Sequence, residues 1–228
     1  MEFIRAAAHF RVKKNGILLI MNFSTFFSEQ ARKPAGLFGR IVMSVVFDKG
    51  NAYLNEFVNE LMSVQANDHV LEIGFGTGKL IHKMAKQVKK GHIEGVDFSG
   101  SMVSIAQRRN KKYIADGKVK ITKNNFNEIL YKDNIFTKVC TVNTIYFWPK
   151  PEYTVKKIAG LLKPEGKFVV AFEDYKQLEQ RKLNRNVFHL YSKDDVKNIL
   201  INAGFSTDVG IESRIKGKSV FHCVVAIK

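Results

Sequence analysis

The sequence has little cysteine and no long apolar run, and both shortages narrow its class. Two of its 228 residues are cysteines, Cys140 and Cys223, and no CxxC motif or Cys/His cluster occurs. We therefore predict no metal site, no disulfide framework and a reduced, cytoplasmic setting. The apolar run at residues 17–21 is far shorter than the roughly 20 residues that span a bilayer, so no membrane span is expected.

Acidic residues are scarce relative to basic ones. The chain has 21 Asp and Glu against 37 Lys and Arg, which gives a net charge of +16. Such an excess can attract a polyanion such as nucleic acid. The basic runs at 86–90 and 108–112, however, fall in the last turns of predicted helices, where the helix dipole favours cations. We therefore predict a generally basic, solvated surface and keep nucleic acid as the less favoured partner.

Hydrophobic periodicity predicts strands that alternate with helices. The predicted strands lie at residues 69–73, 92–98, 118–123, 136–147, 166–173, 205–214 and 218–228, and the predicted helices at 38–46, 54–62, 77–89, 99–115, 151–162 and 192–203. Ser192 and Asp195 form a capping box that begins the last helix, and Gly204 ends it. This alternation implies right-handed βαβ units, and so an α/β fold with a mainly parallel sheet and a C-terminal hairpin.

No internal repeat or low-complexity linker interrupts this pattern. The chain length suits one sizeable core, so we predict a single domain over residues 21–228. Residues 1–20 are expected to be a flexible extension or to precede the native start of the protein.

The stretch VLEIGFGTG, residues 70–78, ends a predicted strand with three glycines in five positions. Such a turn lets a ligand approach backbone that carries no side chains. Dinucleotide-binding turns need G-x-G-x-x-G, but Lys79 stands where the third glycine of that fingerprint belongs. Glu72 is also unhelpful beside a pyrophosphate, whereas a carboxylate suits a ligand with an ammonium and a sulfonium charge. The turn therefore favours S-adenosylmethionine.

Six motifs, in order, resemble those of class I S-adenosylmethionine-dependent methyltransferases, and more narrowly the small-molecule branch called methyltransferase type 11. The motifs are VLEIGFGTG, GVDFS, NNFNEILYKDNIFTKV, NTIYFW, LLKPEGKFVV and YSKDDVKNILINAGF. The resemblance covers roughly residue 51 to the C-terminus. It implies a Rossmann-like, seven-stranded, mainly parallel sheet with an antiparallel C-terminal strand, helices on both faces and an N-terminal helical lid. It also implies S-adenosylmethionine as the cofactor.

The resemblance assigns cofactor-binding residues position by position. Glycines of the first motif form the turn against which the methionine part lies, with Glu72 supporting that loop, and Asp97 is the acid that binds the ribose. Phe98 and Met102 are expected near the adenine. Asn125 and Phe126 stand where the family usually has an acid followed by a small or apolar residue, and Asn143 ends the fourth strand at the reactive end. The full predicted set is Glu72, Gly74, Gly76, Gly78, Asp97, Phe98, Met102, Asn125, Phe126 and Asn143.

The methyl acceptor is less well defined by the sequence. Asn143 is followed by Thr144 and not by the Pro-Pro-aromatic sequence of many amino-group methyltransferases that act on nucleic acid, which disfavours base methylation. Residues 21–50 and 174–191 resemble the family's variable lid and substrate-side insert. The only proton acceptors expected near that edge of the sheet are the catalytic candidates Tyr146, His189 and Tyr191, together with Glu173.

Three functions therefore stay open. The favoured one is methyl transfer to a small-molecule acceptor that is apolar or aromatic, with an anionic acceptor left open because the lid is basic. The second is a methyltransferase that acts on RNA or protein, which predicts positive charge gathered at the pocket mouth. The third is a non-catalytic member that binds the cofactor, which predicts a pocket closed to any acceptor.

Overall fold

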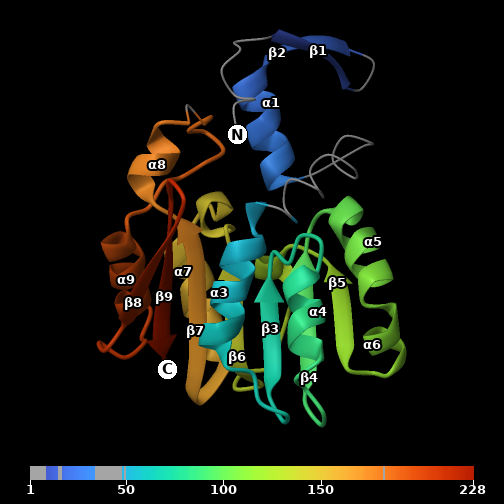
Figure 1. The fold of residues 1–228 in the computed structure, drawn as a ribbon, viewed down its shortest axis with the longest axis vertical. Coiled ribbons are helices and arrows are strands. Elements are labelled where there is room, and N and C mark those ends of the chain that lie inside the picture. Colours follow the sequence, from blue (N-terminus) through green and yellow to red (C-terminus); the bar gives the residue numbers. More distant parts are fainter. Residues whose placement is uncertain (1–8, 15–16, 34–47, 49, 182) are drawn as a thin grey trace.

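The computed structural model describes residues 9–14, 17–33, 48, 50–181 and 183–228, with backbone only up to residue 27. Within these residues the main sheet has seven strands in the order β5-β4-β3-β6-β7-β9-β8 (Figure 1). Its strands are β3 (His69–Ile73), β4 (His92–Asp97), β5 (Val119–Lys123), β6 (Phe136–Val142), β7 (Leu162–Glu173), β8 (Gly210–Lys216) and β9 (Ser219–Ile227). Neighbours pair in parallel from β5 to β7, and β9 runs antiparallel to both β7 and β8. The predicted α/β fold is confirmed.

The register of the parallel strands gathers three chain segments at one edge. Ile73 at the end of β3 is opposite Val96 of β4 and Thr141 of β6. The glycine turn, Asp97 and Asn143 therefore leave the sheet side by side. The chain winds outward in opposite directions on the two sides of the β3–β6 pair, and ligands of open α/β sheets bind at such a switch point.

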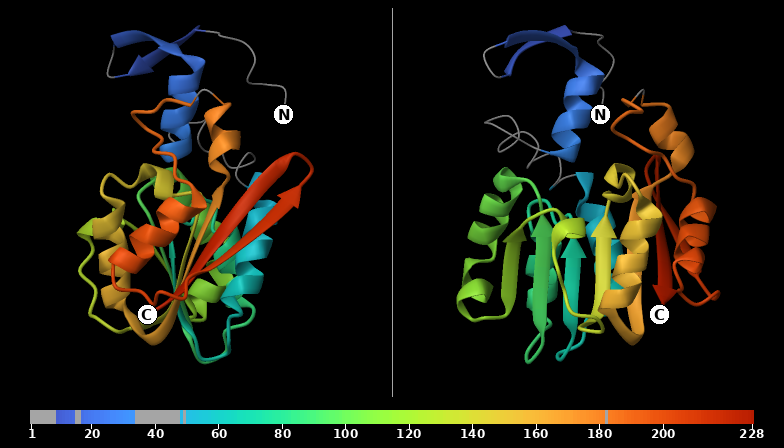
Figure 2. Two further views of the ribbon diagram at one scale, coloured as in Figure 1. Left: turned by 90° about the vertical axis from the view of Figure 1, so that its left-hand side faces the viewer. Right: turned by 180° about the vertical axis from the view of Figure 1, so that it is seen from behind.

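Helices cover both faces of the sheet, as Figure 2 shows in its edge-on view. One face carries α3 (Ala52–Met62), α4 (Lys79–Ala85), α5 (Gly100–Arg109) and α6 (Lys111–Ala115), and the other carries α7 (Pro151–Leu161) and α9 (Lys193–Asn202). Each face has its own apolar core. Phe57 of α3 and Ile81 of α4 pack with Val70 in the first core, and Ile158 of α7 and Leu200 of α9 pack in the second. Burial of both faces explains why the central strands are almost continuously apolar.

The N-terminal residues form a separate unit above the carboxyl edge of the sheet (Figure 1). β1 (His9–Lys14) and β2 (Ile17–Asn22) pair antiparallel and lead into α1 (Phe23–Arg32). The sequence predicted no element before residue 21, so this hairpin is a new feature. The hydroxyl of Ser28 in α1 accepts a hydrogen bond from the backbone N–H of Asn184 at 3.2 Å, which ties α1 to the segment after β7. The helix predicted at 38–46 lies outside the described residues.

Two further differences from the sequence prediction have identifiable causes. The helix predicted at 99–115 divides into α5 and α6 at Asn110, whose side-chain amide donates to the backbone oxygens of Gly78 and Ala106 at 3.1 and 3.0 Å. The strand predicted at 136–147 ends at Val142, because Asn143 adopts a φ of 54° and the short 3-10 helix η2 (Ile145–Phe147) follows. The capping box of α9 and the C-terminal hairpin are as predicted.

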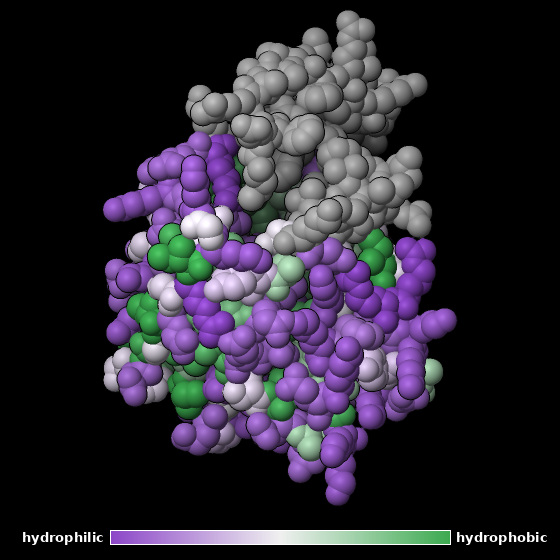
Figure 3. Space-filling view, viewed as in Figure 1, coloured by the Kyte–Doolittle hydropathy of each residue, from purple (hydrophilic) through white to green (hydrophobic). Residues whose placement is uncertain are grey.

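The surface of the described residues carries few large apolar side chains. Leu130, Tyr153 and Ile215 are the large hydrophobic residues that are exposed there, and they are isolated from one another in the sequence. On the face drawn in Figure 3, hydrophilic residues predominate and hydrophobic ones are scattered. Single apolar residues on a surface are ordinary and indicate no interface.

Candidate functional site

The glycine turn after β3 is a backbone that few other residues can adopt. Gly74, Gly76 and Gly78 have φ values of 71°, 53° and 68°, all in the left-handed region. Gly74 also fits closely against the next loop, since a Cβ there would overlap the side chain of Thr144. The two features together explain the G-x-G-x-G spacing. The turn exposes backbone of Gly74 and Gly76 to the cavity beyond the strands.

Two carboxylates flank this turn. Glu72 and Asp97 are only 2% and 8% exposed. The two oxygens of Asp97 accept hydrogen bonds from the backbone N–H of Gly76 at 3.0 Å and of Ser99 at 2.8 Å. Each of those oxygens keeps a second lone pair for a ligand. Oε2 of Glu72 is buried and accepts no hydrogen bond from any residue in the described part of the chain.

The environment of both carboxyl groups disfavours their ionised forms. Burial, and secondarily the charge of Asp97, raises the pKa of Glu72 to about 8. Burial raises the pKa of Asp97 to about 6, although its hydrogen bonds from Ser99 and Gly76 act in the opposite direction. A cation beside these groups would relieve the cost of ionising them. The unpartnered oxygen of Glu72 therefore suits a positively charged ligand group.

The carboxylates lie at one end of a cavity of about 740 Å³, which opens over the carboxyl ends of β3, β4 and β6. This volume is in the range of small-molecule pockets, roughly 300–1,000 Å³. The other end of the cavity reaches α1 and the segment after β7. Predicted residues that line it are Glu72, Gly74, Gly76, Asp97, Phe98, Met102, Asn125, Phe126, Asn143 and Tyr146.

The side of the cavity next to β4 and β5 combines apolar and polar side chains. Met102 and Phe126 are 1% and 6% exposed, and both line the cavity beside Phe98. Asn125 begins the short 3-10 helix η1 (Phe126–Glu128), and its side-chain oxygen accepts from the N–H of Asn127 at 3.2 Å. That oxygen retains one lone pair, so it can still accept a further hydrogen bond from a ligand.

Polar groups converge where β6 ends. The side-chain amide of Asn143 donates to Oδ1 of Asn51 at 2.9 Å, and its oxygen accepts from the hydroxyl of Tyr146 at 3.2 Å. That hydroxyl in turn accepts from the N–H of Glu173 at 2.6 Å. Burial, and then the charge of Glu173, holds the pKa of Tyr146 well above its ordinary value. Tyr146 is therefore a neutral phenol held by two residues, Asn143 and Glu173.

Aromatic rings form the wall of the cavity around Tyr146. The ring of Phe188 lies 5.8 Å from that of Tyr146 and 4.7 Å from that of Phe147, centre to centre. Leu178 and Leu183 line the same region. Aromatic pairs in such tilted arrangements are stabilising and present flat apolar surface.

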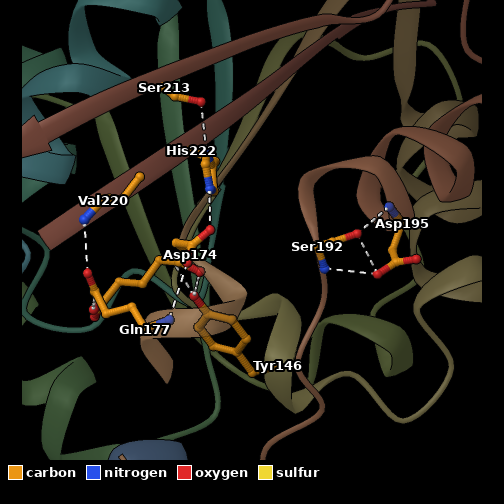
Figure 4. Close-up of polar contacts among 9 residues, drawn as sticks. Tyr146, Asp174, Gln177, Ser192, Asp195, Ser213, Val220 and His222 are labelled. Atoms are coloured by element: carbon orange, nitrogen blue, oxygen red, sulfur yellow. Dashed lines mark hydrogen bonds and ion pairs between the residues drawn. The ribbon is translucent and has the colours of Figure 1, made fainter. Parts of the chain in front are cut away.

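The segment after β7 is held in place by polar contacts around α8 (Tyr175–Glu179), drawn in Figure 4. Asp174 begins this helix and accepts from the N–H of Gln177 at 3.2 Å. Its other oxygen lies 3.1 Å from Nε2 of His222, whose Nδ1 is 2.7 Å from the hydroxyl of Ser213. Glu173 is bonded to Gln177 at 2.7 Å and forms an ion pair with Arg181. The segment is thus fastened to the C-terminal hairpin.

Three predicted residues do not line the cavity. Gly78 begins α4 and packs against α5, where a Cβ would lie 2.7 Å from that of Ala106. His189 and Tyr191 also lie outside the lining, although the N–H of His189 donates to the backbone oxygen of Tyr146 at 3.0 Å. Burial raises the pKa of Tyr191, so its phenol is a poor proton acceptor.

The structure adds two residues that the sequence did not indicate, since Asn51 and Asn55 at the start of α3 line the cavity. Arg32 and Lys33, which belong to the predicted lid, reach the cavity from the end of α1. Within the described residues, no cluster of three His, Cys, Asp or Glu side chains is arranged to hold a metal ion. In the described part of the chain, no helix is both long enough and apolar enough to cross a membrane.

Comparison with known proteins identifies the family and agrees with the fold. A family model described as "Methyltransferase domain" matches residues 65–204, more than half of the chain. The chain belongs to this methyltransferase family. The crystal structure of an S-adenosylmethionine-dependent methyltransferase from Aquifex aeolicus superposes with a TM-score of 0.62, covering 76% of this chain and 88% of that one at 23% identity.

Curated relatives agree with the family. An uncharacterized methyltransferase of Bacillus subtilis, YdaC, is 28% identical over 123 residues, which are 54% of this chain and 66% of that protein. A demethylmenaquinone methyltransferase of Lactobacillus johnsonii is 28% identical over 118 residues, 51% of this chain and 48% of that protein. The chain thus spans less than two thirds of the length of each.

The family membership confirms the predicted class I S-adenosylmethionine-dependent methyltransferase and its cofactor. The methyltransferase site fits that cofactor on the structure's own terms. Its glycine turn leaves backbone free, Asp97 has two free lone pairs for hydroxyl groups, and Glu72 has a buried oxygen without a partner.

Proposed function

We propose that this methyltransferase transfers a methyl group from S-adenosylmethionine to a small acceptor with an apolar, aromatic body. The observation that carries the proposal is the continuity of the cavity, which runs from the Glu72–Asp97 pair to the wall of Tyr146 and Phe188. A pocket for the cofactor alone would need room only for the adenosine and methionine parts on either side of the carboxylates. The further extension to the aromatic wall supports a catalytic function over a binding one.

We assign the cofactor to the carboxylate end. Asp97 would bind the ribose hydroxyls, Glu72 would face the ammonium group, and Phe98, Met102 and Phe126 would enclose the adenine. S-adenosylmethionine supplies, when bound, a methyl group already activated by a sulfonium charge. The remaining contribution of the protein is to align the acceptor and to exclude water.

The side chains at the acceptor end offer little general base. Tyr146 stays neutral because burial raises the pKa of its phenol, and Glu173 is engaged by Arg181 and Gln177. His189 and Tyr191 stay weak catalytic candidates, because neither lines the cavity. The acceptor is therefore expected to bring its own nucleophile, such as an amine, a thiolate or an electron-rich ring carbon.

The charge of the cavity supports a small molecule over a polyanion. Among the residues that the structure describes, the lining contains four basic ones, Arg32, Lys33, Lys123 and Arg181, and four acidic ones, Glu72, Asp97, Glu128 and Glu173. The chain as a whole has 37 basic and 21 acidic residues. The basic excess is thus not concentrated in the lining, as a methyltransferase of RNA would require.

The aromatic wall indicates the shape of the acceptor. The ring centres of Phe147 and Phe188 lie 4.7 Å apart beside Tyr146. Planar apolar groups pack well on such aromatic surfaces. One relative is named for a demethylmenaquinone substrate, which is in keeping with an aromatic acceptor. The N-terminal lid (21–50) and the insert (174–191) would select it, since Arg32, Lys33, Leu178 and Leu183 come from these segments. We place the reaction in the cytoplasm, where Cys140 and Cys223 would stay thiols.

A methyl-transfer screen tests the proposed function. The protein is incubated with methyl-labelled S-adenosylmethionine and a panel of aromatic amines, phenols, thiols and quinols, and in parallel with total RNA and a protein extract. We expect label in an aromatic small molecule. Label found in RNA or protein alone would contradict the proposal, as would tight heparin binding with a steep salt dependence.

Cofactor affinity is expected to depend on pH through Glu72. Its pKa of about 8 means that the group is mostly protonated at pH 6, and an ammonium beside it favours the carboxylate. Binding should release a proton, and affinity should rise about tenfold from pH 6 to 7.5. Calorimetry in buffers of different ionisation enthalpy measures this release, which Glu72→Gln should abolish.

The same pKa shifts govern the stability of the unliganded protein, with the opposite sign. Glu72 titrates near 4.5 in an unfolded chain and near 8 in the fold, so its ionisation opposes folding. The stability that the protonated carboxyl group of Glu72 contributes is fully present below pH 4.5 and is lost as the pH rises through about 8.

The affinity prediction for Glu72 has a clear opposite result. A cofactor affinity that falls between pH 6 and 7.5 would contradict the assigned contact with the ammonium group.

A further inference from the structure

Asp48 makes a compact set of contacts at the back of the glycine turn. Nη2 of Arg109, at the end of α5, lies 2.6 Å from its Oδ2, and Nη1 lies 3.2 Å from its Oδ1. The hydroxyl of Thr77, inside the turn, donates to the same Oδ1. Two-pronged arginine–carboxylate pairs fix both distance and orientation.

Arg109 and Asp48 also make contacts at the glycine turn through backbone oxygens. Nη1 of Arg109 also donates to the backbone oxygen of Thr77 at 2.9 Å, and Nζ of Lys79 donates to the backbone oxygen of Asp48 at 3.3 Å. Thr77 lies between Gly76 and Gly78 and is 5% exposed. Although burial opposes ionisation, hydrogen bonds from Arg109 and Thr77 keep the pKa of Asp48 below its ordinary value. The carboxylate is therefore charged at neutral pH.

The chain that follows Asp48 is attached a second time, on the far side of the switch point. Oδ1 of Asn51 accepts from the amide of Asn143, at the end of β6, at 2.9 Å. Three residues that follow Asp48 in the sequence line the cavity, namely Gly50, Asn51 and Asn55. The start of α3 thus forms a cavity wall that is held to the β3 turn by Asp48 and to the β6 turn by Asn51.

We propose that Asp48 is a positioning residue for cofactor binding, which acts with Arg109 to join the glycine turn and the start of α3 into one rigid unit. Neither side chain lines the cavity. Their effect is on the shape of the backbone that receives the methionine part of the cofactor. This inference rests on the proposed function, because it concerns the affinity for that cofactor.

The test is a double-mutant cycle on the affinity for S-adenosylhomocysteine, measured by calorimetry. Asp48→Asn and Arg109→Gln are each expected to raise Kd about tenfold, and the double variant should bind no worse than either single one, since the two act as a pair. The KM for S-adenosylmethionine should rise in parallel, while kcat at saturating cofactor changes less than twofold. Arg109→Lys keeps the charge but loses the two-pronged geometry, and is expected to resemble Arg109→Gln.

The control is Glu60→Gln, which removes another arginine–carboxylate ion pair of the chain. Glu60 of α3 lies 2.7 Å from Arg214 of β8, and neither residue lines the cavity. This variant should bind S-adenosylhomocysteine as the wild type does. An unchanged Kd in Asp48→Asn would overturn the inference. So would a double variant whose rise in Kd equals the product of the rises in Asp48→Asn and Arg109→Gln. If Asp48→Asn does not fold, an unchanged Kd in Arg109→Lys overturns it equally. A wild-type protein that does not bind the nucleoside contradicts the proposed function itself.

Discussion

Asp97→Ala is expected to weaken the binding of S-adenosylmethionine at least about 100-fold. In the proposed complex, the substitution removes two charge-assisted hydrogen bonds to the ribose, each worth about 1.5–3 kcal/mol, and every 1.4 kcal/mol is a factor of about ten. It also removes the acceptor for the N–H groups of Gly76 and Ser99, which order the turn and the start of α5. Isothermal calorimetry with S-adenosylhomocysteine measures the loss directly.

Asp68→Ala is the matched control for this prediction. Asp68 and Asp97 are both 8% exposed, and Asp68 accepts hydrogen bonds from the N–H of Gln65 at 2.6 Å and the hydroxyl of Thr137 at 2.8 Å. It precedes β3 and so lies at the opposite edge of the sheet from the cavity. Its removal should lower stability and leave Kd unchanged. Equal losses of affinity in both variants would mean that Asp97 acts only through the fold.

Gly74→Ala is expected to cost about 3 kcal/mol of stability and most of the cofactor affinity. Gly74 has a φ of 71°, which disfavours alanine by about 1–2 kcal/mol, and the new Cβ would overlap Cγ2 of Thr144, which adds a cost of overpacking. The turn must shift to relieve the overlap, and with it the backbone that receives the cofactor. Thermal unfolding and calorimetric titration measure the two effects.

Two further variants separate the strain at Gly74 from the overlap. Gly117 has a φ of 70° with nothing within 4 Å of an added Cβ, so Gly117→Ala should cost only about 1 kcal/mol and leave affinity intact. In Gly74→Ala/Thr144→Ser the methyl group is gone and the nearest remaining atom is Cβ of residue 144, at 3.2 Å. Affinity should partly recover there. If the double variant binds the cofactor no better than Gly74→Ala does, the overlap with Thr144 is not the cause of the lost affinity.

The features that the sequence predicted well are those with a local signal. Hydrophobic periodicity marked every strand of the main sheet, and the capping box of Ser192 and Asp195 marked the start of α9. The spacing of Gly74 and Gly76 could be recognised because only glycine adopts such φ values freely. The role of Asp97 is implied by the family resemblance, and in the structure the pairing of β4 with β3 brings it to the turn.

The features that the sequence missed depend on contacts between distant residues. No spacing rule pairs Asp48 with Arg109 or Asn51 with Asn143, because these pairs form only after the sheet and its helices have packed. The break at Asn110 has the same origin, since its side chain bonds to Gly78 across two helices.

The catalytic candidates show the same limit. His189 and Tyr191 are near Phe188 in sequence, and Phe188 lines the cavity, but in this irregular segment the neighbours lie outside the lining. The N-terminal hairpin also went unpredicted, because the apolar run at 17–21 was too short to indicate more than a loose extension. The sequence thus predicted residues that line the proposed cofactor end, whereas two of its three catalytic candidates lie outside the lining.

A crystal structure of the protein with S-adenosylhomocysteine is the most direct test of the proposed site. We predict the ribose hydroxyls about 3 Å from the carboxylate of Asp97, and the amino acid part against Gly74 with its ammonium near Oε2 of Glu72. The nucleoside found elsewhere, or the same cleft occupied in preference by a nicotinamide dinucleotide, would contradict the account.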